Sequence, residues 1–326
     1  MSLDPSVAAV RLAVRRGLAD VGDHPVLVAC SGGADSLALL AATVFEARGN
    51  PWYVVGVTVD HGLQEGSADR ADRVVAQMAG LGVDETVAVR VTVESRGQGP
   101  EAAAREARYT VLEEVAQRFG STVVLLGHTL DDQAETVLMG LARGSGGRAL
   151  AGMRRGFDVF RRPLLDVTRT QTVAACRAEG IAWWSDPHND DPRFTRSRVR
   201  TRVLPVLEEE LGPGVTSALA RTADLLREDA QALDEIAART HAALLREDGL
   251  DVEALCEQPA AVLGRIVRLA ALEAGSPAAE LFRVHVAAVA DLVHGPSAGK
   301  QVQLPGHVTA YVESHRLRFR RTAVTG

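Results

Sequence analysis

The chain has 326 residues, of which 46% are apolar, and a net charge of −6. This length predicts about two domains of roughly 100–200 residues each, and no apolar run approaches the roughly 18 residues needed to cross a bilayer. Three scattered cysteines, Cys30, Cys176 and Cys256, form no Cys-x-x-Cys pair, which argues for a reducing compartment and against zinc or iron–sulfur sites. We therefore expect a cytoplasmic protein with no membrane partner.

The first predicted strand, residues 26–29, ends in Cys-Ser-Gly-Gly-Ala-Asp-Ser (30–36), and an Ala/Leu-rich helix follows. Adjacent glycines let backbone N–H groups point into one concavity, where the helix N-terminus and serine hydroxyls also favour an anion. A Walker A loop is excluded because the only lysine is Lys300, and the Gly-x-Gly-x-x-Gly fingerprint is absent. The loop resembles the PP-loop of adenylating ATP pyrophosphatases. It predicts ATP contacts at Ser31, Gly32, Gly33, Ala34, Asp35 and Ser36.

Strands and helices then alternate as far as about residue 165. The pattern predicts strands over 51–59, 86–93 and 122–126, and helices over 67–81, over 100–119 and from residue 131. Such alternation predicts a parallel doubly wound sheet with helices on both faces, an α/β fold. Ligands bind at the carboxyl ends of such strands. We therefore expect further ATP contacts at Val57, Val59, His61 and Gly127, although Asp60-His61-Gly62 could also be an ordinary turn.

A second motif, Gly-His-Thr-Leu-Asp-Asp-Gln-Ala-Glu-Thr (127–136), begins at the end of the strand over 122–126. Asp132 and Glu135 are three residues apart and share a helix face. Beside a phosphate loop, such carboxylates suit Mg²⁺, which usually takes one or two of them plus phosphate oxygens. We predict Asp35 and Asp132 as Mg²⁺ ligands, and Asp35, His128, Asp132 and Glu135 as catalytic residues. The alternative is that the acids only complement the helix dipole.

Residues 143–202 carry thirteen arginines against six acidic residues, a net charge of +7 in an otherwise acidic chain. A concentrated arginine segment indicates a polyanion partner, although solvated or salt-bridged arginines would give the same pattern. Arg105 and Arg108 are neighbours on one face of the helix over 100–119 and could reach a phosphate or base. The predicted polyanion contacts are Arg105, Arg108, Arg143, Arg196, Arg198, Arg200 and Arg202.

The rest of the chain predicts a second, smaller domain. A short strand over 157–162 and a helix over 168–179 lead to a boundary near 205–214. One long helix is expected over 215–245, two more over 260–274 and 278–294, and short strands over 301–304, 307–312 and 316–320. We therefore expect a catalytic domain over 1–210 and a mainly helical domain with a few short strands over 211–326.

Further motifs follow the PP-loop in a fixed order. They are Val-Asp-His-Gly-Leu (59–63), Glu-Ala-Ala-Ala-Arg-Glu-Ala-Arg-Tyr (101–109), Gly-His-Thr-Leu-Asp-Asp-Gln-Ala-Glu-Thr-Val-Leu-Met (127–139), Leu-Ala-Arg-Gly-Ser-Gly-Gly (141–147), Arg-Pro-Leu-Leu (162–165) and Trp-Ser-Asp-Pro-His-Asn (184–189). Over roughly residues 26–207 this series resembles the tRNA(Ile)-lysidine synthetase family.

The resemblance implies a two-step reaction. ATP adenylates C2 of the wobble cytidine of the CAU-anticodon tRNA(Ile), and free L-lysine then displaces AMP, so the products are lysidine, AMP and pyrophosphate. The polyanion would then be tRNA, which the arginines and the domain over 211–326 would contact. The PP-loop would stabilise the departing pyrophosphate and Mg²⁺ the charge at the α-phosphate. Asp132 and Glu135 are also candidates to receive the lysine side chain.

The chain departs from the family pattern at His188, which precedes Asn189, and at Ser197, between Arg196 and Arg198. The alternatives are another PP-loop adenylating enzyme, such as a cluster-binding tRNA thiolase or an amide-forming synthetase, and a non-catalytic nucleotide- or RNA-binding module. Ungrouped cysteines argue against the thiolase, and the intact acidic residues argue against the module. The oligomeric state stays open, with a homodimer as one option.

Overall fold

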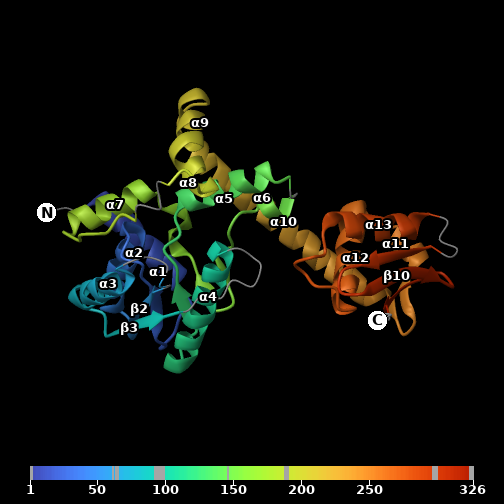
Figure 1. Ribbon diagram of the computed structural model, residues 1–326, viewed down its shortest axis with the longest axis horizontal. Coiled ribbons are helices and arrows are strands. Elements are labelled where there is room, and N and C mark those ends of the chain that lie inside the picture. Colours follow the sequence, from blue (N-terminus) through green and yellow to red (C-terminus); the bar gives the residue numbers. More distant parts are fainter. Residues whose placement is uncertain are drawn as a thin grey trace. The chain divides into compact units, whose positions relative to one another are not determined.

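The computed structural model describes residues 3–60, 62, 66–91, 100–144, 147–186, 191–295 and 300–322. The chain packs as two compact units, unit 1 (Met1–Leu225) and unit 2 (Leu226–Gly326), and each is described by itself (Figure 1). Helix α10 (Val215–Leu244) runs through the boundary between them. The predicted division into domains at residues 210 and 211 stays a prediction.

Unit 1 alternates strands and helices, as expected. Its elements up to residue 142 are α1 (Pro5–Gly17), β1 (Val26–Ala29), α2 (Ala34–Ala47), β2 (Val54–Asp60), α3 (Ser67–Leu81), β3 (Glu85–Arg90), α4 (Pro100–Phe119), β4 (Val123–Leu125) and α5 (Leu130–Ala142). The later elements are α6 (Gly147–Leu150), β5 (Gly156–Phe157), β6 (Phe160–Arg161), η1 (Pro163–Asp166), α7 (Arg169–Ala178), α8 (Thr195–Arg198), the π-helical turn η3 (Val199–Val203) and α9 (Leu204–Glu210).

The unit-1 sheet has the strand order β3-β2-β1-β4-β6-β5. Neighbouring strands are parallel except at the edge, where β5 pairs antiparallel with β6. The prediction of a parallel sheet is therefore confirmed. The prediction of one strand over 157–162 was wrong, because the segment turns back on itself at Asp158, whose φ of 47° lies in the left-handed region.

Helices cover both faces of this sheet, because side chains alternate across a strand. Val26 and Val28 of β1 pack into a core with α1, α2, α3 and α7. Leu27, between them, packs on the opposite face with Leu112 of α4. Each of these side chains is fully buried, which contributes about 1.5–3 kcal/mol apiece. The doubly wound α/β fold is confirmed, and its core fixes where β1 and β4 end.

The sheet has a topological switch point between β1 and β4. From β1 the chain passes through α2 to β2 on one side, whereas β4 lies on the other side of β1. Loops that leave two such strands diverge and leave a crevice at their carboxyl ends, where ligands of open α/β sheets bind. The loop over 30–36 follows β1, and the motif that begins at Gly127 follows β4. Both predicted motifs thus flank one crevice.

Unit 2 packs three helices and the end of α10 against a second sheet. The elements are β7 (Leu245–Arg246), β8 (Gly249–Asp251), α11 (Val252–Cys256), α12 (Ala260–Glu273), α13 (Arg283–His294), β9 (Gln301–Leu304), β10 (Val308–Glu313) and β11 (Arg316–Arg321). The strands are antiparallel in the order β7-β8-β11-β10-β9. A helical C-terminal region with short strands is confirmed.

Two details of unit 2 differ from expectation. The helix expected over 278–294 begins only at Arg283, because the N–H groups of Glu280 and Leu281 donate to the carbonyl of Pro277 in turns. The strands β7 and β8 were not expected. Among the described residues, no helix is long and apolar enough to cross a membrane.

Candidate active site

The loop after β1 is folded around the side chain of Ser36. The Ser36 hydroxyl accepts a hydrogen bond from the Ser31 N–H (3.1 Å) and donates to the Gly33 carbonyl (3.0 Å). Gly32 has a φ of 82°, and a Cβ there would come within 2.7 Å of Val74 in α3. Only glycine satisfies both demands. Helix α2 follows with Gly33 at its N-cap, so the unpaired N–H groups of its first turn face this loop, an arrangement suited to phosphate.

The segment before residue 187 lies against the same loop. The Trp184 N–H donates to the Gly32 carbonyl (3.0 Å), and the Gln77 side chain donates to the Ala182 carbonyl (2.8 Å). The Arg70 guanidinium lies 3.7 Å from the centre of the Trp184 ring. The motif over 184–189 therefore reaches the PP-loop, but His188 and Asn189 lie outside the described residues.

Asp35 stands in the first turn of α2 and faces α7. One carboxylate oxygen accepts a hydrogen bond from the Thr172 hydroxyl, and the other lies 3.5 Å from Nε of Arg169. Burial raises the pKa of Asp35, and the nearby Asp132 charge adds to this, whereas Thr172 and Arg169 oppose it. One oxygen is thus held in place by Thr172 and the other lies near Arg169, both of α7.

The two carboxylate oxygens of Asp132 have different partners. Its Oδ2 accepts from the Thr129 N–H (2.9 Å) and hydroxyl (3.1 Å), which caps the N-terminus of α5. Its Oδ1 accepts from Arg169 (2.9 Å) and Arg200 (3.3 Å). Burial opposes ionisation of this carboxyl, but Arg169, the Thr129 N–H and Arg200 outweigh it, so its pKa is lowered. The capping contact agrees with the dipole alternative, and the role of Asp132 as a Mg²⁺ ligand and catalytic residue stays a prediction.

Glu135 is fully buried and surrounded by arginines. Arg200 donates to it through Nε (2.7 Å) and Nη2 (3.0 Å), while Arg169 and Arg196 each come within 3.5 Å. We call the carboxylates of Asp35, Asp132 and Glu135, with the guanidinium groups of Arg169, Arg196 and Arg200, the ionic cluster. Its carboxylates come from α2 and α5, and its arginines from α7, α8 and η3.

Arg169 is the member of the ionic cluster that the sequence did not single out. It is the first residue of α7, where its backbone N–H donates to Asp131 (2.7 Å). Its guanidinium reaches all three carboxylates of the cluster. The sequence signal for Arg169 was weak. It is one of thirteen arginines in the basic segment, and it directly follows Thr168, the N-cap residue at which the helix begins.

His128 lies beside the cluster at the end of β4. Its Nδ1 accepts from Nε of Arg162 (3.2 Å), and Arg162 also donates to the Arg154 carbonyl (2.7 Å) and the Tyr109 hydroxyl (3.1 Å). Burial, together with the charges of Arg162 and Arg108, lowers the pKa of His128 to about 3 against the attraction of Asp132. The imidazole is therefore neutral near pH 7. Since Nδ1 is an acceptor, Nε2 carries the proton and is a hydrogen-bond donor.

Among the remaining predicted ATP contacts, Gly127 and Val57 lie against the segment over 30–36. Gly127 approaches the PP-loop so closely that a Cβ would lie 3.1 Å from the backbone of Ser36. The Val57 carbonyl already accepts from the Cys30 N–H (2.8 Å), whereas Val59 lies beyond the end of β1. His61 lies outside the described residues. Gly62, next to it, donates to Asp60 (2.9 Å) in the expected turn.

Comparison with known proteins agrees with this geometry. Residues 8–207 match the family model of the PP-loop domain, and residues 250–321 match that of the TilS substrate binding domain. The tRNA(Ile)-lysidine synthase of Thermobifida fusca is 53% identical over 304 residues, which cover 93% of this chain and 94% of that protein. The tRNA(Ile)-lysidine synthase of Streptomyces coelicolor is 47% identical over 352 residues, covering 98% of this chain and 100% of the relative.

The chain belongs to the tRNA(Ile)-lysidine synthase family. The resemblance found from the ordered motifs is therefore confirmed. Among solved structures, the U34-tRNA thiolase NcsA from Methanococcus maripaludis with its [4Fe-4S] cluster aligns with a TM-score of 0.58 at 21% identity, over 68% of this chain and 80% of that one. That likeness shows a shared fold. The alternatives to the lysidine synthase family are not favoured, and the described residues contain no group of three or more metal-binding side chains that could hold a metal ion.

Four of the seven arginines predicted to contact tRNA lie between residues 196 and 202. Arg196 and Arg200 are ion-paired with Glu135, as the salt-bridge alternative expected. Arg198 donates to the carbonyls of Pro192 (2.7 Å) and Arg193 (3.0 Å). Arg202 is exposed.

The other three arginines lie on α4 and at the end of α5. Arg105 and Arg143 are exposed, and Arg108 is half-buried. Arg105 donates to the hydroxyl of Tyr109 (3.2 Å), one turn along α4. The side chains of Arg105, Arg143 and Arg202 are exposed, so a polyanion in solution can reach them. Contact between tRNA and the seven arginines stays a prediction.

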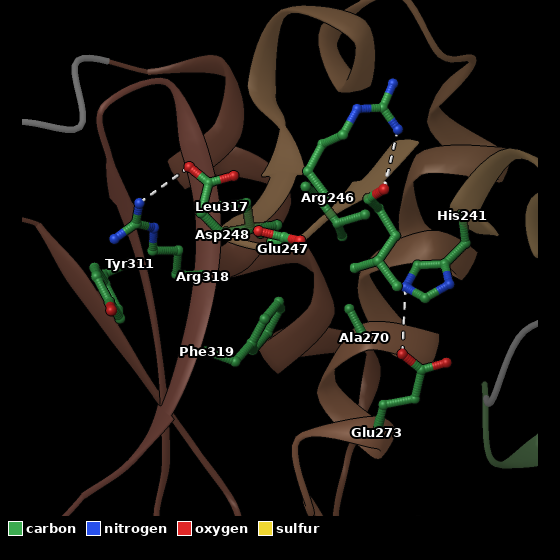
Figure 2. A pocket seen from close by; sticks show the side chains of 13 residues that line it. His241, Arg246, Glu247, Asp248, Ala270, Glu273, Tyr311, Leu317, Arg318 and Phe319 are labelled. Carbon is green, nitrogen blue, oxygen red and sulfur yellow. Dashed lines mark hydrogen bonds and ion pairs between the residues drawn. The ribbon is translucent and has the colours of Figure 1, made fainter. Parts of the chain in front are cut away.

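Unit 2 has a separate cavity of about 430 Å³, between the end of α10, the β7–β8 turn, α12 and β10–β11 (Figure 2). His241 and Glu273 lie 3.5 Å apart in it. Its charged lining comprises Arg246 and Arg318 but also Glu247, Asp248 and Glu273. Because the charges are mixed, this lining does not select for a polyanion, and the crevice of unit 1 remains the candidate active site.

Proposed function

We propose that this chain ligates L-lysine to C2 of the wobble cytidine of CAU-anticodon tRNA(Ile). ATP first adenylates the cytidine, with release of pyrophosphate, and the ε-amino group of lysine then displaces AMP to give lysidine. The observation that carries the proposal is the meeting of a PP-loop and two site-facing carboxylates, Asp35 and Asp132, at one switch point in a member of this family.

The PP-loop supplies the ATP site in this proposal. Helix α2 directs its first-turn N–H groups at the loop, which suits the β and γ phosphates that leave as pyrophosphate. Ser31 contributes a hydroxyl group to the loop. Gly127 has no side chain, so the end of β4 does not clash with the Ser36 backbone. Neutral His128, with Nε2–H as donor, would hydrogen-bond a phosphate oxygen without competing for a proton.

Two carboxylate oxygens suit the predicted Mg²⁺. The second oxygen of Asp35 is held by Thr172 and that of Asp132 by Thr129, so each residue turns its remaining oxygen toward Arg169. Two carboxylate oxygens with phosphate oxygens and water form an ordinary Mg²⁺ environment. When bound, Mg²⁺ would neutralise charge that develops at the α-phosphate.

Asp132 is also the main candidate for lysine recognition, as an alternative to its use by Mg²⁺. Both oxygens of Glu135 already accept from Arg200, and its side chain is fully buried. Asp132 has an oxygen that faces the crevice and a lowered pKa, so it is a carboxylate at neutral pH and can pair with an ammonium group. Glu135 would then act through Arg200 and Arg196, whose guanidinium groups it holds.

The tRNA would contact the exposed arginines of residues 1–210 and the domain over 211–326. A cytoplasmic location would give the enzyme access to tRNA. The chain could also form a homodimer, which light scattering in solution would test. Both belong to the proposal and neither is needed for the chemistry in unit 1.

Pyrophosphate release tests the first step. The wild-type protein should release pyrophosphate from ATP only when the CAU-anticodon tRNA(Ile) is present, and Asp35→Asn should abolish this release. Asp69→Asn is a matched control, because Asp69 is an exposed carboxylate in the first turn of α3, and it should leave the rate unchanged. Equal release without tRNA, or full activity of Asp35→Asn, would reject the proposal.

A further inference from the structure

The ionic cluster has no charge left for an additional cation. Its three carboxylates, Asp35, Asp132 and Glu135, face three guanidinium groups, Arg169, Arg196 and Arg200. The proposed function nevertheless requires a cation to enter, either Mg²⁺ with ATP or the ammonium group of lysine. A second cation beside a neutralised pair is repelled by the first. Departure of one resident arginine would remove this repulsion and expose a carboxylate to either cation.

The contacts of the three arginines identify the one that leaves. Arg196 approaches only Glu135, at 3.5 Å, so its departure would uncover neither Asp35 nor Asp132. Arg200 binds Glu135 with two hydrogen bonds of 2.7 and 3.0 Å in the fork geometry that makes such pairs strong. Arg169 makes one short contact, 2.9 Å to Asp132, and two of 3.5 Å to Asp35 and Glu135. Its side chain is 26% exposed, so it can swing out without opening the core.

The position of Arg169 also connects it with the ATP site. The guanidinium lies over the two oxygens that an entering cation would use, Oδ2 of Asp35 and Oδ1 of Asp132. Asp35 is itself a residue of the PP-loop, so a triphosphate bound there would place several negative charges within a few ångströms of Arg169. The planar guanidinium fork of arginine matches the geometry of phosphate as well as that of carboxylate.

We propose that Arg169 is the resident counter-ion of the ionic cluster and blocks its cation site until a triphosphate at the PP-loop draws the guanidinium away. Nucleotide then binds before, or together with, the cation that replaces Arg169. This inference rests on the proposed function, in which a triphosphate and a small cation share the crevice. Arg169 acts as a positioning residue, because it controls access to Asp35 and Asp132.

Cation binding without turnover tests this inference. Isothermal titration calorimetry would measure Mg²⁺ alone and L-lysine alone, each with and without α,β-methylene-ATP, on the full chain without tRNA. For the wild type we expect the cation that uses the site to bind at least tenfold more tightly with the nucleotide analogue. Arg169→Gln should bind that cation at least tenfold more tightly without nucleotide, and the analogue should add little.

Two further variants separate blocking from a structural role. Arg169→Lys keeps the positive charge and should restore the dependence on nucleotide. Arg177→Gln removes an exposed arginine from the same helix and should behave as wild type. The two titrated cations show whether Mg²⁺ or the ammonium group takes the place of Arg169.

No gain for either cation in Arg169→Gln, or wild-type binding that ignores nucleotide, would overturn the inference. Lysidine formation by the wild type is measured separately. If the wild type forms lysidine and Arg169→Gln gains no cation affinity, only this inference fails. If the wild type forms no lysidine, the proposed function fails whatever the titrations show.

Discussion

Replacement of Glu135 by glutamine should destabilise unit 1 strongly. The Glu135 side chain is 0% exposed, and three arginines approach its carboxylate, two of them at 3.5 Å and Arg200 at 2.7 and 3.0 Å. Gln keeps the volume but removes the negative charge, which leaves guanidinium groups uncompensated. Removal of one partner from a buried pair costs about 3–5 kcal/mol.

The lower end of that range applies here. Arg169 and Arg200 are 26% and 23% exposed, so water can solvate part of the charge that is left behind, and we expect a loss of about 3 kcal/mol. For a unit of this size, 1 kcal/mol corresponds to roughly 2–4 °C. The midpoint of thermal unfolding should therefore fall by roughly 6–12 °C.

Tryptophan fluorescence follows this transition selectively, because Trp52, Trp183 and Trp184 are the only tryptophans and all lie in unit 1. Arg193→Gln is the control, since it breaks an exposed ion pair with Asp191 and should leave the midpoint unchanged. A thermal unfolding midpoint of Glu135→Gln within about 2 °C of the wild type would refute the argument that the cluster is shielded from water and that its arginines depend on the charge of Glu135.

Three further predictions concern the crevice and the exposed arginines. Gly127→Ala would place a Cβ 3.1 Å from the Ser36 backbone and should weaken ATP binding about tenfold in equilibrium titrations; unchanged affinity would contradict the close approach. Burial lowers the folded-state pKa of His128 to about 3, below the ordinary histidine value of 6.5, so the folded state binds fewer protons between these values. Stability therefore falls as pH drops below about 6.5, by up to ~1.4 kcal/mol per pH unit. His128→Gln should flatten this slope in urea unfolding from pH 7.5 to 5.5, and parallel slopes would contradict it. Arg202→Gln should weaken tRNA binding and reduce the slope of log affinity against log salt by about 1 without a change in ATP affinity; an unchanged slope would remove Arg202 from the tRNA surface.

Local patterns in the sequence predicted the parts of the site that depend on single elements. Alternating strands and helices predicted the parallel sheet, and the turn after β1 predicted the PP-loop. The pairing of Asp35 with Asp132 followed from the rule that loops at the carboxyl ends of parallel strands meet. The structure brings both residues to one guanidinium group, with Asp35 near Nε and Asp132 at Nη2 of Arg169.

Such local patterns did not predict the contacts between segments that are far apart in the sequence. Asp35 and Arg169 are 134 residues apart, and they meet because Cys176 and Ala175 of α7 pack in the core with α2. The ion pair of Glu135 with Arg200 likewise spans 65 residues. Charge alone indicated a polyanion surface at Arg200, whereas the tertiary fold gives it a buried carboxylate partner. The strands β7 and β8 were missed because two- and three-residue strands leave almost no periodic signal.

The most direct test of the central claim is the incorporation of lysine into tRNA. Purified protein, ATP, Mg²⁺ and labelled L-lysine are incubated with a transcript of the CAU-anticodon tRNA(Ile), and the wobble nucleoside is analysed by mass spectrometry. We predict lysidine at the wobble position, formed together with AMP and pyrophosphate in equal amounts and only when ATP, lysine and tRNA are all present. Release of AMP with no lysine on the transcript, or equal release without tRNA, would contradict the proposed function.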